Sequence, residues 1–88
     1  MDLVSSVHEL SNSIINIYPN PANDVVNIDI EGKLDYLLAI YDLEGKLIES
    51  SKNSRQIKVE LIPIGTYILK IKDLKSGQKI VEKIVIGR

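Results

Sequence analysis

The sequence predicts an all-β fold, a seven-stranded antiparallel Greek-key sandwich of the immunoglobulin-like kind. Short runs of alternating apolar and polar residues are separated by turn signals at roughly ten-residue spacing, which is typical of a sandwich or barrel. The apolar residues make up 44% of the chain and are mostly Ile, Leu and Val. Branched side chains of this kind pack well on a pleated sheet. No stretch keeps the 3.6-residue periodicity of an amphipathic helix.

Seven runs are predicted to form strands, each bounded by Pro, Gly, Asn or Asp. In chain order they cover residues 14–18, 25–30, 36–43, 46–51, 56–61, 66–72 and 79–86. Between the first two strands, Pro19 and Pro21 fix their own φ and restrict the preceding residues, so this segment is a rigid turn. Gly45 supplies the positive φ that the hairpin between the third and fourth strands needs.

Later strands show the clearest alternation. In the fifth strand, the apolar side chains of Ile57, Val59 and Leu61 alternate with charged ones. In the sixth, residues 67, 69 and 71 are predicted to point inward and the lysines at 70 and 72 outward. Each run therefore has one face suited to a core and one suited to solvent.

The 88 residues suffice for one domain. We expect residues 1–12 to be a linker from an upstream cargo domain and residues 13–88 to fold; the alternative is that the linker adds one irregular edge strand. There are no cysteines, which excludes disulfides and thiolate metal sites. No run approaches the ~20 apolar residues of a membrane helix, and residues 1–13 lack the pattern of a secretory leader.

Charge is distributed unevenly along the chain. Residues 1–51 carry nine acidic and two basic residues, whereas residues 52–88 carry three acidic and nine basic ones. Because the two halves interleave in a sandwich, pairing of opposite charges across neighbouring strands is the favoured interpretation. The alternative is a basic face for an anionic partner. The lysines lack interleaved aromatic residues, which disfavours nucleic-acid binding.

Candidate chemical groups are few. His8 is the one histidine and lies in the expected linker. Asp24, Asn27, Asp29 and Glu31 lack the order of a calcium loop and are interpreted as an acidic strand face. Serines 50, 51 and 54 have no nearby base in the sequence. We therefore predict no catalytic, cofactor-binding or metal-binding residue, and no enzymatic activity.

Four motifs remain, and each alone could be purely structural. They are Tyr-Pro-Asn-Pro-Ala at 18–22, Asp-Leu-Glu-Gly-Lys at 42–46, Gly-Thr-Tyr-Ile-Leu-Lys-Ile at 65–71 and Lys-Ile-Val-Ile at 83–86. In this order and spacing they resemble the type A C-terminal sorting domains of type IX secretion cargo from Bacteroidota. The resemblance covers residues 14–88, and its first and third motifs are the more specific ones.

The resemblance implies that the domain is a C-terminal sorting signal on a larger exported protein. Such a tail is recognised by the outer-membrane translocon and shuttle proteins in the periplasm. A surface sortase then cleaves it and joins the cargo to lipopolysaccharide, so that the cargo is found at the cell surface or outside. The recognition elements implied here are Pro19, Asn20, Pro21, Gly45, Lys46, Gly65, Tyr67, Lys83, Ile84, Val85 and Ile86. Cleavage is expected before Ile14, and no cofactor is implied.

The last strand would suit recognition by strand addition, because an edge strand offers backbone donors and acceptors to a receptor. The alternative function is a small carbohydrate-binding or adhesive module. Sugar-binding platforms need exposed aromatic rings, and this chain has only Tyr18, Tyr36, Tyr41 and Tyr67. That scarcity favours the sorting function.

Overall fold

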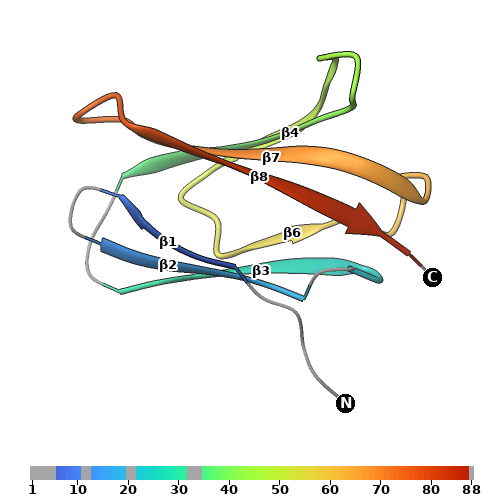
Figure 1. Cartoon of the computed structure of the whole chain (residues 1–88), viewed down its shortest axis with the longest axis horizontal. Coiled ribbons are helices and arrows are strands. Elements are labelled where there is room, and N and C mark those ends of the chain that lie inside the picture. The colour runs from blue at the N-terminus through green and yellow to red at the C-terminus, as the bar shows by residue number, and fades with distance from the viewer. Residues whose placement is uncertain (1–5, 11–12, 20–21, 32–34, 88) are drawn as a thin grey trace.

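The structure, a computed structural model, describes residues 6–10 by their backbone and residues 13–19, 22–31 and 35–87 in full. Within these ranges it contains eight strands and no helix (Figure 1). They are β1 (Ser6–Leu10), β2 (Ser13–Tyr18), β3 (Val25–Ile30), β4 (Tyr36–Tyr41), β5 (Leu47–Lys52), β6 (Gln56–Lys58), β7 (Gly65–Asp73) and β8 (Lys79–Ile86).

The strands form two four-stranded antiparallel sheets that lie one over the other (Figure 1). The first sheet has the order β1-β2-β3-β6 and the second the order β5-β4-β7-β8. All seven predicted strands are present, with ends shifted by a few residues. The additional strand, β1, falls in the expected linker, where an edge strand was the alternative, and pairs with β2 along its whole length.

The core fills the space between the sheets with aliphatic side chains. These side chains come from alternate positions of the strands, which point toward the other sheet. In β7, residues 67, 69, 71 and 73 are buried, while the side chains between them are more exposed. This pattern confirms the inward and outward assignments made from the sequence. The largest fully buried side chains are Ile15, Ile17, Val26, Ile28, Leu38, Ile40, Val59, Leu69, Ile71, Ile84 and Ile86.

The prediction for the fifth strand was wrong beyond Lys58. The amide of Val59 donates to the carbonyl of Asp24 at 2.8 Å, and the amide of Ile62 donates back to Val59 at 3.0 Å, which turns the chain. Alternation therefore stops, and Leu61 is 94% exposed rather than buried. The third strand likewise ends at Tyr41, before the predicted Leu43, because the hairpin turn starts at residue 42.

The loop after β5 is anchored to the start of β4. The hydroxyl of Tyr36 donates to the Ser54 carbonyl at 2.5 Å, and the Tyr36 amide donates to Oδ1 of Asn53 at 2.8 Å. Burial raises the pKa of the Tyr36 hydroxyl above its usual value, and the charge of Arg55 partly offsets that rise. Tyr36 thus joins the second sheet to the loop that leads into the first.

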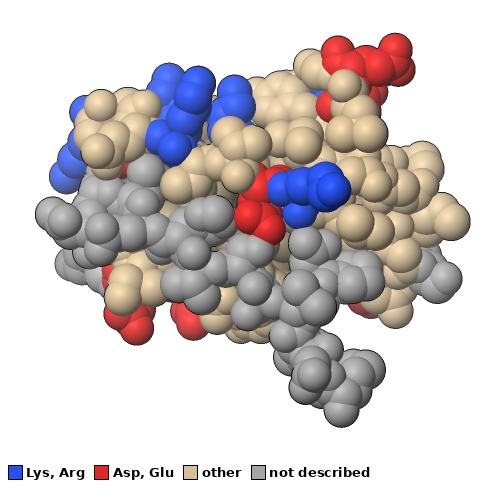
Figure 2. Space-filling view, viewed as in Figure 1, with Lys and Arg blue, Asp and Glu red and all other residues tan. Residues whose placement is uncertain are grey.

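The charges of the second sheet gather on its outer side. The outward positions of β5, β7 and β8 include a set of lysines that we call the lysine face: Lys52, Lys70, Lys72, Lys79 and Lys83. In Figure 2 the blue atoms lie over the upper half of the molecule, along this sheet. Lys72 stands directly opposite Lys79, and Lys70 opposite Val81. At Lys70 and Lys72, therefore, the strand register places no opposite charge on β8, contrary to the favoured interpretation.

We predict that Lys79→Glu stabilises the domain. The substitution replaces a like-charged cross-strand pair with Lys72 by an oppositely charged one, a change of about 0.2–1 kcal/mol in the free energy of unfolding. Urea denaturation at low salt measures it. Lys75→Glu, in the β7–β8 turn, makes the same change in net charge without facing Lys72 and serves as the control. An equal gain in both variants would contradict the pairwise explanation.

We predict that ionisation of the Tyr36 hydroxyl contributes to the loss of stability at high pH. Its pKa is higher in the folded than in the unfolded protein, so its stabilising effect is complete below about pH 10, the unfolded value. The effect is lost as the pH rises through the folded pKa. Urea midpoints measured across this range should fall less steeply for Tyr36→Phe than for the wild type. Parallel curves would show that Tyr36 does not contribute.

Candidate recognition site

The turn after β2 reaches across to the end of β8. The amide of Ala22 donates to the Val85 carbonyl at 2.7 Å, and the amide of Gly87 donates to the Ala22 carbonyl at 2.8 Å. Ala22 and Ile86 thereby form an isolated parallel bridge, and Ala22 is buried. Segments more than sixty residues apart in the sequence are thus joined by backbone hydrogen bonds, linking the first predicted motif to the fourth.

The third motif lies directly beside the fourth. Gly65 stands opposite Ile86, Thr66 opposite Val85 and Tyr67 opposite Ile84, all in the antiparallel β7–β8 pair. Gly65 has a φ of +154°, which disfavours a side chain, whereas a Cβ there would meet Tyr67 only at an ordinary contact distance of 3.7 Å. The need for glycine therefore comes from the backbone and not from crowding.

The second motif forms the β4–β5 hairpin. Oδ1 of Asp42 accepts hydrogen bonds from the amides of Glu44 and Lys46, both at 2.9 Å, and Gly45 has a φ of +89°. An aspartate at this position replaces backbone partners within the turn, and the glycine allows the positive φ. These contacts confirm the predicted hairpin and its glycine, and they hold the exposed Lys46 in place.

The hairpin lies at the same end of the sandwich as the other motifs. Tyr41, the last residue of β4, stands opposite Ile68 of β7, so the chain leaves the sheet beside the start of β7. Figure 1 shows this hairpin, the start of β7 and the end of β8 at one side of the molecule, with the β7–β8 turn at the other. We call this surface the motif end.

The predicted recognition residues differ in how accessible they are. Ile84 and Ile86 are 1% exposed and belong to the core, so their side chains are unavailable to a partner. Lys83 and Val85 point outward, Lys46 is exposed and Pro19 is half-buried. Asn20 and Pro21 lie outside the described residues. A partner can therefore reach only part of the predicted set.

Tyr67 stabilises the motif end from inside. Its ring is 8% exposed, and its hydroxyl donates to the Pro63 carbonyl at 2.6 Å. This bond fixes the segment that leads from β6 into β7. The role is structural, and it fits the expectation of a core tyrosine whose hydroxyl reaches a partner at the rim.

Sequence reasoning included Ala22 in a motif but did not single it out as important. Its small size, which suits the close backbone approach to β8, was the available signal. The end of β8 was also expected to offer its backbone to a receptor. At Val85 and Gly87 that backbone is already bonded to Ala22, so strand addition is excluded at those groups.

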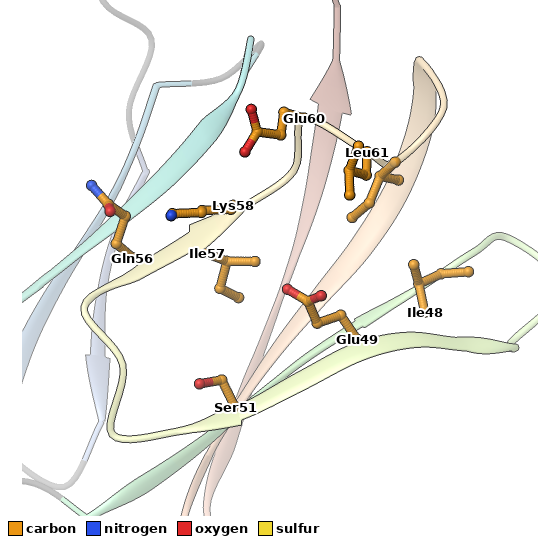
Figure 3. Close-up of a pocket in the computed structure, with 9 residues that line it drawn as sticks. Ile48, Glu49, Ser51, Gln56, Ile57, Lys58, Glu60 and Leu61 are labelled. Atoms are coloured by element: carbon orange, nitrogen blue, oxygen red, sulfur yellow. The ribbon is translucent and has the colours of Figure 1, made fainter.

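A groove opens along the edge of the sandwich, between the edge strands β5 and β6 (Figure 3). It has a volume of about 610 Å³, with Glu49 and Ser51 on one wall and Lys58 on the other. Ser51 Oγ is hydrogen-bonded to Ser54 Oγ. Across the described residues, no group of three or more His, Cys, Asp or Glu could hold a metal ion.

In a comparison with protein families, the chain matches the secretion system C-terminal sorting domain over residues 16–87. The chain belongs to this family of type IX secretion sorting domains. The match runs from β2 to β8 and includes all four motifs, so the resemblance noted from the sequence is confirmed. No curated protein matches the chain. In the part of the sorting domain that the structure describes, no helix is long and apolar enough to cross a membrane.

We predict that Tyr67→Ala destabilises the sorting domain by about 3–5 kcal/mol, because it removes a buried ring. Tyr67→Phe keeps the ring and loses only the hydrogen bond to Pro63, which should cost about 0.5–1.5 kcal/mol. Denaturant unfolding of both variants measures the difference. Equal losses would mean that the hydroxyl, and not the packing of the ring, accounts for the contribution of Tyr67.

Proposed function

We propose that this sorting domain is a non-catalytic signal whose motif end is read by the type IX export machinery. The family assigns a C-terminal sorting signal, and cargo of this kind is exported across the outer membrane. The single observation that carries the proposal is the gathering of all four family motifs at one end of the sandwich. A receptor contacts one continuous surface, and motifs that share one end of the sandwich can supply such a surface.

We further propose the events around export. The larger cargo passes through the periplasm, the domain meets the shuttle protein and the outer-membrane translocon, and a sortase cleaves before Ile14 and attaches the cargo to the cell surface. A sequence boundary near residue 13, with a cargo domain upstream, belongs to the same proposal. Strand β1 lies before this position and pairs with β2, so cleavage there would cut the covalent link between β1 and the rest of the sandwich.

We also propose a Greek-key, immunoglobulin-like topology for the scaffold. The sheet orders β2-β3-β6 and β5-β4-β7-β8 support it, since the chain changes sheet between β3 and β4, β5 and β6, and β6 and β7. Such connections bring loops from both sheets to each end of a sandwich. This arrangement supports a recognition surface built from several short segments.

The carbohydrate-binding alternative gains no support from the four tyrosines. Tyr36 and Tyr67 are buried, and Tyr18 and Tyr41 are half-buried. Nζ of Lys70 lies 4.9 Å from the centre of the Tyr41 ring and partly covers it. These four are all the aromatic residues of the chain, so no fully exposed ring is present to stack on a sugar.

A reporter assay tests the function. Residues 1–88 are fused to the C-terminus of a periplasmic reporter in a host with type IX secretion, and extracellular reporter is measured. We predict export of the wild-type fusion and at least about a tenfold loss for Leu43→Ser/Lys46→Glu, by analogy with truncation of a central binding contact. Both residues are exposed in the β4–β5 hairpin at the motif end.

The matched control is Leu74→Ser/Lys75→Glu, which changes the same residue types in the β7–β8 turn at the opposite end. It should be exported like the wild type. Equal loss in the two variants would overturn the motif end as the recognised surface. Retention of the wild-type fusion in the periplasm would overturn the sorting function itself.

A further inference from the structure

The lysine face carries positive charge without any carboxylate on its described strand positions. Outward residues of β7 and β8 are Thr66, Ile68, Lys70, Lys72, Lys79, Val81, Lys83 and Val85. Glu82 stands opposite the buried Leu69 and so belongs to the other side of the sheet. The face is thus basic although the whole chain has a net charge of −1.

Stability does not explain this arrangement. Lys72 and Lys79 are both exposed and directly opposite each other, and like charges in this position repel. A structure selected for stability alone would pair one of them with a carboxylate. The repulsion therefore points to a use for the charge outside the domain.

Protection of sheet edges explains only some of the lysines. Lysines on edge strands discourage sheet-to-sheet aggregation, which accounts for Lys79 and Lys83 on β8 and Lys52 on β5. Lys70 and Lys72 are on β7, which is flanked by β4 and β8 and has no open edge. Lys70 has a partner inside the domain, because its Nζ lies over the Tyr41 ring. Lys72 is left without an explanation from edge protection.

Apolar side chains share the face with the lysines. Leu37 and Val85 are 37% exposed and Val81 is 52% exposed, and all three lie on the outward side of the second sheet. A polyanion that offers only charge would leave them in water. The chain has neither Trp nor Phe to act as an anchor at a membrane surface, and the outward Tyr41 is half-buried with Lys70 over its ring. A partner with both carboxylates and apolar side chains fits best.

We propose that the lysine face is a docking surface for an acidic protein surface. Carboxylates of the partner pair with Lys70, Lys72 and Lys79, and its apolar side chains pack on Leu37 and Val81. Complementary charge of this kind speeds association and selects the partner. Lys72 and Lys79 lie beside the β7–β8 turn, away from the motif end. Lys70 and Lys83 belong to the third and fourth motifs, so the two proposed surfaces adjoin along β7 and β8.

The test measures binding of the full chain to a synthetic peptide of alternating Glu and Val at low salt. We predict measurable binding that weakens steeply as salt is added, because exposed charges beyond about 10 Å are screened at 0.1 M. Lys72→Glu should weaken it about tenfold, since the new carboxylate repels the peptide and also pairs with Lys79. That pairing favours the fold, and a thermal melt checks that the variant remains folded.

Lys58→Glu is the matched control, with the same change in net charge on β6 of the first sheet, and it should change binding less than about twofold. A Lys–Val peptide of equal length should not bind. Equal losses for Lys72→Glu and Lys58→Glu would overturn the proposal, because binding would then follow net charge alone. Binding to phosphatidylglycerol vesicles without binding to the Glu–Val peptide would overturn it in favour of a membrane surface.

Discussion

The two backbone hydrogen bonds between Ala22 and the end of β8 are the constraint on which the motif end depends. The two sheets of a sandwich otherwise touch only through side chains, which tolerate sliding more readily than directed bonds do. Here a turn of the first sheet is held by the last strand of the second. Gly65 stands opposite Ile86, the residue of β8 that Ala22 bridges, so the third motif begins beside this bridge.

Much of this fold could be predicted from the sequence because local and global signals agree. The alternation in β7 correctly assigned Tyr67 and Leu69 to the core. The prediction failed at Leu61, where the alternation continues in the sequence but a long-range bond from Val59 to Asp24 turns the chain. Tertiary hydrogen bonds of this kind do not change the apolar–polar alternation of the sequence, so they cannot be predicted from it. Strand β1 was uncertain for a related reason, since it is an edge strand that pairs with β2.

The motif residues could be identified from the sequence, but their convergence could not. Short motifs report local turns and strands, whereas their meeting at one end depends on the order of strands in the two sheets. The burial of Ile84 and Ile86 was equally hidden, because the last strand shows only mild differences between its faces in sequence. The charge asymmetry could be counted from the sequence, whereas only the strand register shows that Lys72 stands opposite Lys79 and Lys70 opposite Val81.

The bridge at Ala22 has a consequence for quality control. Its partners are Val85 and Gly87, which a ribosome adds more than sixty residues after the turn itself. A polypeptide halted before Gly87 lacks one of the two bonds and a polypeptide halted before Val85 lacks both. A receptor that contacts the Ala22 bridge would therefore bind only chains that have been translated through Gly87 and have folded. Truncated or unfolded cargo would lack the surface that it recognises.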